Sequence, residues 1–536
     1  MQYDNSKSEK GEGVNFPNKF VILPYKKMLA KVISAAVLGL EAVPVTVEVD
    51  VSSQSLPAFT IVGLPDKAVE ESKERVRSAL KNSGAEFPPR RITVNLAPAD
   101  LPKEGPAYDL PIALGLLIAS GQLEADMSDA LVLGELSLDG SLRHVSGVLP
   151  TAILAKEKGF KKIFLPKVNA KEAAVISRLS VYPVENLSDL VRHLSGHTEI
   201  KPHKLVKIEE IFSQEEPYEF DFSEIRGQEK AKRALEIAAT GGHNILMKGP
   251  PGSGKTLLSR SLPSILPKLT FGEALEVTKI YSVCGLLGDD CLVKTRPFRS
   301  PHHTASHIGL VGGGNRPAPG EISLAHRGVL FLDELPEFPR HVLESLRQPL
   351  EDGWITVSRA AGSVKFPSKF ILVGAQNPCP CGWLGDPKKE CICAPASVTR
   401  YQKRISGPLL DRIDIHFEVP HVKVEKLTGE DLKNIEDSKT IRARVQKARD
   451  IQTKRFMGRK TCSNGEMTNK EIKEFCKIDD NSKQLIRAAI TQMGLTARGF
   501  MRVLKLARTI ADLDNSKEIQ ALHIAEALQY RPRQES

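Results

Sequence analysis

The sequence predicts an α/β multidomain protein with a helical C-terminal region, and three observations support this fold class. Short apolar strands alternate with helical stretches over the first third of the chain, a pattern typical of a mixed α/β domain. A glycine-rich loop near the middle of the chain follows a buried strand and precedes a helix, which indicates a second α/β domain. Apolar residues near the C-terminus recur with helical spacing.

The domain order follows from changes in sequence pattern along the chain, and 536 residues are too many for a single core. We expect residues 1–28 to form a disordered tail, 29–195 the first α/β domain, 196–221 a linker, 222–420 the second α/β domain and 421–536 a helical lid.

The elements of the two outer regions can be predicted from their apolar patterns. In the first domain we expect strands at Val45–Val51, Ile92–Leu96, Leu131–Leu133 and Lys162–Leu165, and helices at Asp66–Ser83 and Leu110–Ser120. In the C-terminal region we expect helices at Asn469–Cys476, Asn481–Met493, Ala497–Asp512 and Glu518–Gln529.

Composition excludes several classes of protein. With 41% hydrophobic and 26% charged residues the chain resembles an ordinary globular protein, and the candidate apolar stretch Val32–Leu40 is too short to cross a bilayer. The eight cysteines, four of them clustered, favour a reduced compartment over a disulfide scaffold. The net charge is +10, and the basic excess lies mainly after residue 421. Such an excess is compatible with a nucleic-acid partner but equally with a solvated helical surface.

The glycine-rich loop predicts a nucleotide site. It has the form G-x-x-x-x-G-K-[ST] between a strand, Asn244–Met247, and a helix, so its backbone amides can surround phosphate. Lys255 would neutralise the β- and γ-phosphates of ATP, and Thr256 would bind Mg²⁺. The loop residues are Gly249, Pro250, Pro251, Gly252, Ser253, Gly254, Lys255 and Thr256.

Two later strands end in polar residues that complete this site. The strand Gly328–Leu332 ends in Asp333, which would hold Mg²⁺ through water, and Glu334, which would orient and polarise the attacking water. The strand Phe370–Gly374 is followed by Asn377, which suits a polar sensor of the γ-phosphate. The sequence therefore predicts ATP hydrolysis with Mg²⁺ as cofactor.

A four-cysteine cluster follows Asn377 directly. Cys379, Cys381, Cys391 and Cys393 have the pattern C-x-C-x9-C-x-C, and four thiolates suit a closed tetrahedral Zn²⁺ site of structural type. Four free thiols in a loop remain an alternative, and an iron–sulfur cluster is disfavoured by the spacing.

Longer motifs resemble those of a known family. The segments Arg296–Thr304, Gly312–Gly314 and Pro319–His326 resemble the magnesium-chelatase-like AAA+ ATPases, and within them the ComM/YifB branch. The resemblance extends from about Leu29 to Pro532, nearly the whole chain. It implies an AAA+ core and a helical lid of the magnesium-chelatase C-terminal type.

The resemblance also implies a ring. Arg412 is the first choice for an arginine finger and Arg404 the second; a finger acts on a neighbour's nucleotide and so requires an oligomer, typically a hexamer. Arg498 would reach the γ-phosphate from the lid as a second sensor, although either arginine could instead form a surface salt bridge. Gln228 lies in a segment that resembles the one beside adenine.

Two insertions are implied as well. A hairpin near Trp354–Phe366 would face the ring pore, where Arg359 and Lys365 could contact DNA phosphates; exposed hairpin charge is the alternative. The other insertion would include His302 and His303, which we interpret as structural or subunit-facing because adjacent side chains point apart and no carboxylate motif accompanies them.

Residues 29–195 resemble the Lon-protease-like domain, which has a βαβ core of the ribosomal-protein type. Lon peptidases use a serine nucleophile in Gly-Pro-Ser-Ala-Gly and a lysine further along the chain. Here the matching stretch has Ala107 at the nucleophile position, and no lysine matches later. An alanine side chain cannot attack a carbonyl, so we expect no protease activity.

The expected function is that of an ATP-driven ring motor on DNA, moving branched or single-stranded recombination intermediates as a helicase or branch-migration enzyme, for instance in natural transformation. Such a motor would work in the cytoplasm without a membrane partner. A magnesium-chelatase subunit driving metal insertion into a porphyrin is the second hypothesis, disfavoured by the Lon-like domain. A protein-remodelling ATPase that does not act on DNA is the third, because fold alone does not separate these functions.

Overall fold

The structure is a computed structural model that describes residues 29–52, 56–213, 218–288, 290–314, 317–359, 362–387, 389–422, 436–493 and 495–531. The predicted tail, residues 1–28, lies outside the described residues. The chain divides into two compact units: an N-terminal unit up to Val37 and from Ala42 to Leu205, and a C-terminal unit made of Leu38–Glu41 and the chain from Val206 on. Their sequence boundary falls inside the segment predicted as a linker.

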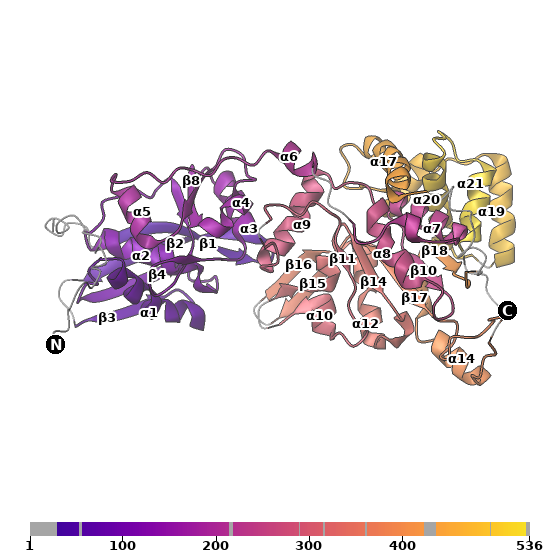
Figure 1. The fold of residues 1–536 in the computed structure, drawn as a ribbon, viewed down its shortest axis with the longest axis horizontal. Coiled ribbons are helices and arrows are strands. Elements are labelled where there is room, and N and C mark those ends of the chain that lie inside the picture. The colour runs from indigo at the N-terminus through magenta and orange to yellow at the C-terminus, as the bar shows by residue number, and fades with distance from the viewer. Residues whose placement is uncertain are drawn as a thin grey trace, which may run out of the picture. The chain divides into compact units, whose positions relative to one another are not determined.

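The N-terminal unit is built on a seven-stranded sheet of order β3-β4-β2-β1-β5-β8-β9 (Figure 1). Strands β2 and β4 pair antiparallel, whereas the β3–β4, β1–β5, β5–β8 and β8–β9 pairs are parallel. The strands are β1 (Leu29–Leu38), β2 (Glu41–Ser52), β3 (Ala58–Val62), β4 (Arg91–Ala97), β5 (Ala130–Val132), β8 (Lys162–Pro166) and β9 (Ser180–Val184).

Helices and a small hairpin complete this unit. The helices are α1 (Lys67–Asn82), α2 (Asp109–Ala119), α3 (Val148–Glu157), α4 (Ala170–Ala173) and α5 (Leu187–Leu194), with short helices η1 (Pro106–Tyr108) and η2 (Lys167–Asn169) and the hairpin β6 (Glu135–Leu136) and β7 (Leu142–Arg143).

The sequence pattern explains the two best-packed elements of the N-terminal unit. In β2, Val45, Val47 and Val49 are fully buried, as the two-residue period of a strand requires. Every residue of α2 is buried, including Asp109. Arg75 of α1 donates to both carboxylate oxygens of Asp109, at 2.6 and 3.0 Å, so the buried charge is paired.

The core of the C-terminal unit is a parallel five-stranded sheet of order β11-β14-β17-β10-β18. Because all of these pairs are parallel, the carboxyl ends of the strands meet at one edge of the sheet. The strands are β11 (Phe298–Arg299), β14 (Val329–Leu332), β17 (Ile371–Gln376), β10 (Ile245–Lys248) and β18 (Ile415–Glu418).

Helices and small hairpins surround this sheet. The helices are α6 (Ile208–Ser213), η3 (Phe222–Glu224), α7 (Glu229–Gly241), α8 (Lys255–Ile265), α9 (Phe271–Val283), α10 (His307–Val311), α11 (Glu321–Leu324), η4 (Leu335–Glu337), α12 (Arg340–Ser345), α13 (Arg347–Asp352), α14 (Pro395–Gln402) and α15 (Gly407–Leu410). The hairpins are β12 (Gly312–Gly313) with β13 (Ala318–Pro319), and β15 (Trp354–Arg359) with β16 (Gly362–Pro367).

The C-terminal helices pack on α7 and α8, and share one apolar core with them (Figure 1). They are α17 (Ser438–Arg455), η6 (Asn464–Glu466), α18 (Asn469–Phe475), α19 (Asp480–Met493), α20 (Ala497–Leu513) and α21 (Ala521–Gln529). The predicted fold class, α/β with a helical C-terminal region, is confirmed. No helix among the described residues is long and apolar enough to cross a membrane.

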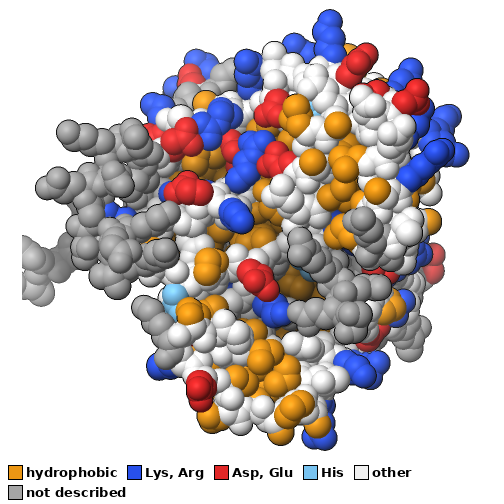
Figure 2. Space-filling view, turned by 90° about the vertical axis from the view of Figure 1, so that its right-hand side faces the viewer, with side chains coloured by type: hydrophobic (Ala, Val, Ile, Leu, Met, Phe, Trp, Pro, Cys, Tyr) orange, Lys and Arg blue, Asp and Glu red, His pale blue; other side chains and the backbone are white. Residues whose placement is uncertain are grey.

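Much of the basic charge of the C-terminal helices is neutralised within the fold. Arg455 and Arg508 both pair with Asp512, and Arg459 pairs with Glu474. Figure 2 shows Lys and Arg side chains interspersed with Asp and Glu on the face that it draws. The positive net charge therefore gives only weak support for a nucleic-acid surface.

Candidate nucleotide site

The glycine-rich loop lies between β10 and α8, at the carboxyl edge of the parallel sheet. The ammonium group of Lys255 donates to the carbonyl oxygens of Gly249 and Pro250, at 2.7 and 2.8 Å, and to Oδ1 of Asn377 at 3.2 Å. Two residues predicted from separate strands are therefore adjacent, and both lie at the loop.

Close backbone packing positions the loop. The amide of Gly249 donates to the carbonyl of Gln376, and a Cβ atom on Gly249 would lie 2.3 Å from the carbonyl oxygen of Val419. Only glycine fits between the ends of β17 and β18 at this point. The side chain of Gln228 reaches the same region, where its Nε2 donates to the carbonyl of Pro420 at 2.6 Å.

The predicted magnesium ligands are in contact. The hydroxyl of Thr256 donates to Oδ2 of Asp333 at 3.0 Å, so a hydroxyl oxygen and a carboxylate oxygen converge beside the loop. Mg²⁺ prefers oxygen ligands and usually retains several waters, so these two side chains fit the ion in that mode. Bound there, Mg²⁺ would neutralise charge on the phosphates.

Burial lowers the pKa of the Lys255 ammonium, and the carboxylates of Asp333 and Glu334 oppose that shift. The lysine side chain is thus poorly hydrated and close to negative charge. An ammonium group in such a place gains strongly from contact with phosphate oxygens, because little water remains to be displaced.

A histidine lies at the predicted catalytic carboxylate. Nδ1 of His303 is 3.6 Å from Oε2 of Glu334. The rings of His302 and His303 have centroids 4.1 Å apart, so the expectation that these adjacent side chains point apart is wrong. Sequence reasoning missed this contact because His303 follows β11 and Glu334 follows β14, and only the sheet joins the two strand ends.

The predicted arginine finger is buried in the single chain. The Arg412 side chain is 8% exposed, its guanidinium pairs with Glu351, and its Nη1 donates to the carbonyl of Pro408. Arg412 precedes β18, whereas the phosphate loop follows β10, and the two parallel strands are in register. Arg412 therefore lies at the opposite edge of the sheet from its own phosphate loop, as a finger acting on a neighbour would.

The predicted second-sensor residue, Arg498, lies close to the same carboxylate. Nη2 of Arg498, at the start of α20, is 3.5 Å from Oε1 of Glu351, and the Arg498 side chain is largely exposed. Both arginines thus share one partner that the sequence did not suggest. Because Arg498 lies beside Arg412, we expect any contact of Arg498 with a γ-phosphate to involve the nucleotide of a neighbouring subunit.

Arg404, the second choice for a finger, has a different environment. Its Nη1 donates to Oε2 of Glu337 at 2.6 Å, just after the turn that carries Glu334. A hollow of about 830 Å³ beside it is lined by further cations, Arg340, Arg400 and Lys403.

The predicted hairpin is formed by β15 and β16, which pair antiparallel. Ile355 and Phe366, which pair across its two strands, are buried, whereas Lys365 is exposed, with its Nζ 5.0 Å from the ring centroid of Trp354. The side chain of Arg359 and residues 360–361 lie outside the described part of the chain.

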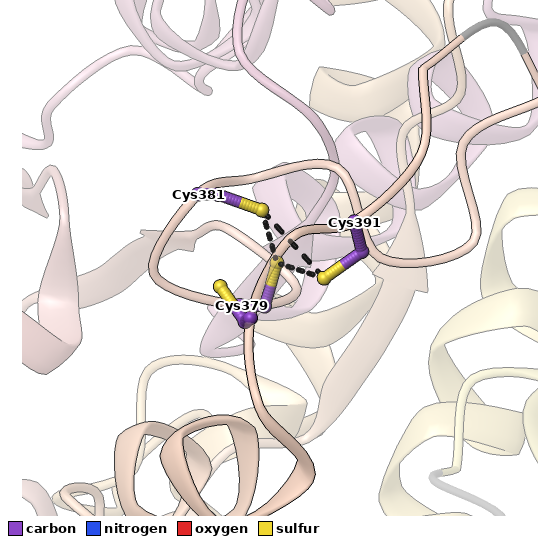
Figure 3. Close-up of side chains that lie close together, drawn as sticks. Cys379, Cys381 and Cys391 are labelled. Carbon is purple, nitrogen blue, oxygen red and sulfur yellow. Dashed lines mark hydrogen bonds between the residues drawn. The ribbon is translucent and has the colours of Figure 1, made fainter.

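The four predicted thiols converge. The Sγ atoms of Cys379, Cys381, Cys391 and Cys393 all lie within 4.8 Å of one another, and Figure 3 shows three of them directed toward a common point. The Sγ atom of Cys379 lies 3.4 Å from that of Cys381 and 3.6 Å from that of Cys391. Sulfur atoms at tetrahedral corners around Zn²⁺ would be about 3.8 Å apart, so the donor set fits this ion.

The pKa of one of these thiols, that of Cys381, is lowered from its usual value. The backbone amide of Trp383 lowers the pKa of Cys381 to about 6. Because the thiolate is the form that binds a metal, this amide favours the ligand form of Cys381 near neutral pH.

In the N-terminal unit, Ala107 lies in the short helix η1, in the stretch matched to the Lon nucleophile. The nearby Lys103 is fully buried, and its ammonium group donates to the carbonyl of Pro98. Ala107 and Lys103 therefore do not form the serine–lysine pair that a Lon peptidase requires.

Comparison with known families gives matches across most of the chain. The family model described as "Magnesium chelatase, subunit ChlI" matches residues 221–427. "Subunit ChlI of Mg-chelatase" matches residues 47–169, and "Magnesium chelatase, subunit ChlI C-terminal" matches residues 435–531.

Curated relatives match over nearly the full length. The Competence protein ComM of Haemophilus influenzae is 46% identical over 507 residues, which cover 94% of this chain and 97% of that protein. The uncharacterized protein YifB of Escherichia coli is 43% identical over 505 residues, with the same coverage. A magnesium-chelatase subunit ChlI homolog of Methanocaldococcus jannaschii is 24% identical over 353 residues, or 59% of this chain and 87% of that protein.

Proposed function

Because this chain belongs to the magnesium-chelatase-like ComM/YifB family of AAA+ ATPases, we propose that it is an ATP-driven ring motor that acts on DNA. One observation carries the step from ATPase to DNA: the likeness to a competence protein spans 94% of this chain and 97% of that relative. The proposed activity is helicase or branch migration on branched or single-stranded recombination intermediates, carried out in the cytoplasm.

Contacts within one chain support the hydrolytic part of the proposal. Lys255 and Asn377 would bind the γ-phosphate, and Thr256 and Asp333 would hold Mg²⁺. Glu334 would take a proton from the attacking water as its oxygen bonds to the γ-phosphorus and the bond to the β-phosphate oxygen breaks.

A neighbouring subunit would complete the site. Arg412 lies at the edge of the sheet opposite to its own phosphate loop, which supports a role on another chain's nucleotide. Rings are common among AAA+ proteins, and we propose a hexamer in which Arg412 leaves Glu351 to stabilise charge on the transferring phosphoryl group of the neighbour. Arg498 would move with it, since both bind the same carboxylate.

The β15–β16 hairpin would contact the DNA. Lys365 is exposed on it, and Arg359 ends β15. An exposed cation at a moving hairpin can bind phosphates without reading sequence, as a motor on varied DNA requires.

The comparisons bear on the magnesium-chelatase alternative in two ways. The family model that matches residues 47–169 is itself described as a ChlI subunit. We expected the N-terminal unit to argue against a chelatase subunit, and this match removes that argument. The relative named as a ChlI homolog, however, matches only 59% of this chain at 24% identity. A DNA motor therefore remains the better-supported proposal, and the protein-remodelling alternative has no feature of its own in its favour.

The decisive test measures ATP turnover with and without forked or four-way DNA. We expect DNA to stimulate turnover and the binding of DNA to weaken steeply with salt. Lys255→Ala should abolish nucleotide binding, and Glu334→Gln should bind ATP but lower turnover by about 10²- to 10⁴-fold, as loss of a general base does.

Lys365→Ala separates DNA contact from hydrolysis. It should retain basal turnover, lose much of the stimulation and reduce the salt dependence by about one phosphate contact. Lys483→Ala is the matched control, because it removes another exposed lysine, which lies on α19 and pairs with Asp480. Turnover that is indifferent to every DNA form, with no salt-sensitive binding, would contradict the DNA proposal and leave the ATPase intact.

A further inference from the structure

The four-cysteine cluster lies directly against the phosphate loop. Gly382, between Cys381 and Trp383, approaches Pro251 so closely that a Cβ atom on Gly382 would lie 2.6 Å from Cδ of Pro251. The backbone between two of the four cysteines therefore lies in contact with the loop that surrounds phosphate. A residue with a Cβ atom would fit at this contact only if one of the two segments moved.

A second connection runs through the predicted sensor. Asn377 accepts from the ammonium of Lys255 at 3.2 Å, and Cys379 follows it by two residues. Between them, the carbonyl of Pro378 accepts from Nε2 of Gln402. Fixing the sulfur of Cys379 in a buried position therefore fixes the end of β17 from which Asn377 reaches the phosphate loop.

A third connection reaches the side of the site occupied by Gln228. Oδ2 of Asp386 is 3.0 Å from Nε2 of His421, and the rings of Trp383 and His421 stack with centroids 6.0 Å apart. His421 follows Pro420, whose carbonyl accepts from Gln228. The residues around the thiols thus contact three separate parts of the nucleotide site.

We propose that zinc binding by the four thiolates and nucleotide binding by the phosphate loop are coupled, each raising the affinity of the protein for the other. Without the ion, the four sulfurs no longer constrain the segment from Cys379 to Cys393, which then has greater conformational freedom. Nucleotide binding would order Pro251 and Asn377 and remove this freedom, so binding would cost more conformational entropy in the zinc-free protein. Coupling between two sites is reciprocal and typically amounts to about 5- to 150-fold in affinity. The inference rests on the proposed ATP and zinc sites and does not involve DNA.

The test compares zinc-loaded full-length protein with protein stripped by a chelator, in the absence of DNA. We expect stripping to weaken binding of a fluorescent, non-hydrolysable ATP analogue by at least about 5-fold. In the reciprocal arm, saturating analogue should slow zinc transfer to a chromogenic chelator. Trp383 gives an independent optical signal in a Trp354→Phe background, because the chain has only two tryptophans.

Two variants separate the metal from its contact with the phosphate loop. Gly382→Ala keeps all four thiols and should retain one zinc per chain, yet it should weaken nucleotide binding, because its Cβ meets Pro251 and because the φ of +85° at this position favours glycine. Cys379→Ser should lose both zinc and nucleotide affinity. Cys462→Ser is the matched control, since this cysteine lies outside the cluster and should change neither measurement.

Three results would overturn the inference. Wild-type protein purified without zinc, and unable to bind it, would remove the site. Equal nucleotide affinity in the loaded and stripped states would remove the coupling, as would full affinity in Gly382→Ala. If Cys379→Ser fails to fold, the nucleotide affinities of the zinc-stripped wild type and of Gly382→Ala still test the coupling. Intact coupling without any DNA stimulation would contradict only the proposed DNA motor.

Discussion

Single side chains at the nucleotide site are held by contacts between strand ends. Glu334 adopts a left-handed backbone conformation, with φ of 49°, at the turn after β14. Its side chain is half-exposed and lies 3.6 Å from His303. The predicted catalytic carboxylate, on an exposed turn, can adopt several rotamers, and a neighbouring imidazole restricts them.

Replacing this imidazole should affect turnover more than binding. We expect His303→Ala to lower kcat by about 5- to 10-fold, the effect of one partly exposed polar pair, with little change in KM for ATP. His303→Gln, which can still donate to Glu334, should recover most of the loss. Steady-state kinetics of both variants test this, and a raised KM at unchanged kcat would show that His303 acts in binding instead.

At the scale of elements, helix α9 is attached to the sheet by buried charge. Glu273 in its first turn pairs with Arg296, which precedes β11, at 3.0 Å, and lies 3.9 Å from Arg327, which precedes β14. Arg296 also donates to the carbonyls of Pro267 and Arg327. These bonds join the helix to the amino ends of two strands whose other ends carry the site.

This attachment should make stability depend on pH. Burial alone would raise the pKa of Glu273, but Arg296 and Arg327 outweigh it and lower that pKa to about 2. A carboxyl whose pKa is lower in the folded state stabilises the protein above its unfolded pKa, and this contribution is lost as pH falls from about 4.3 toward 2. The contribution near neutral pH is on the order of 3 kcal/mol.

Urea unfolding of the wild type and of Glu273→Gln between pH 7 and pH 3 measures the effect. The variant should be less stable at pH 7, and the two free energies of unfolding should converge as the pH falls. A constant difference across this range would mean that Glu273 does not carry the pH dependence.

At the scale of the whole molecule, the proposed function divides the catalytic site between two chains. The phosphate loop and the predicted arginine finger, Arg412, of one chain lie at opposite edges of the same sheet, and the Arg412 guanidinium forms an ion pair with Glu351. Under the proposed ring, hydrolysis would depend on an interface in which the neighbour's Arg412 exchanges its bond to Glu351 for one to phosphate.

Mixed rings test this dependence. Lys255→Ala and Arg412→Ala proteins should each be inactive alone, and mixing them should restore part of the turnover, because some interfaces then pair an intact phosphate loop with an intact finger. Arg404→Ala mixed in the same way serves as the comparison for the second candidate. Mixtures no more active than either parent, despite exchange of subunits, would argue against a finger acting between chains.

The sequence alone determined the features that depend on neighbouring residues. The glycine-rich loop, the strand-ending Asp333 and Asn377, and the alternation that forms β2 are local patterns, and a strand followed by a polar residue places that residue at one edge of a parallel sheet. The fold class and the convergence of the four thiols could be predicted for the same reason.

Only the tertiary structure decided which distant side chains meet. The contact of His303 with Glu334, the shared partner Glu351 of Arg412 and Arg498, and the packing of Gly382 on Pro251 each join segments that no periodicity connects. Such pairs depend on strand order and on the packing of helices against the sheet, which are set by long-range burial rather than by local spacing.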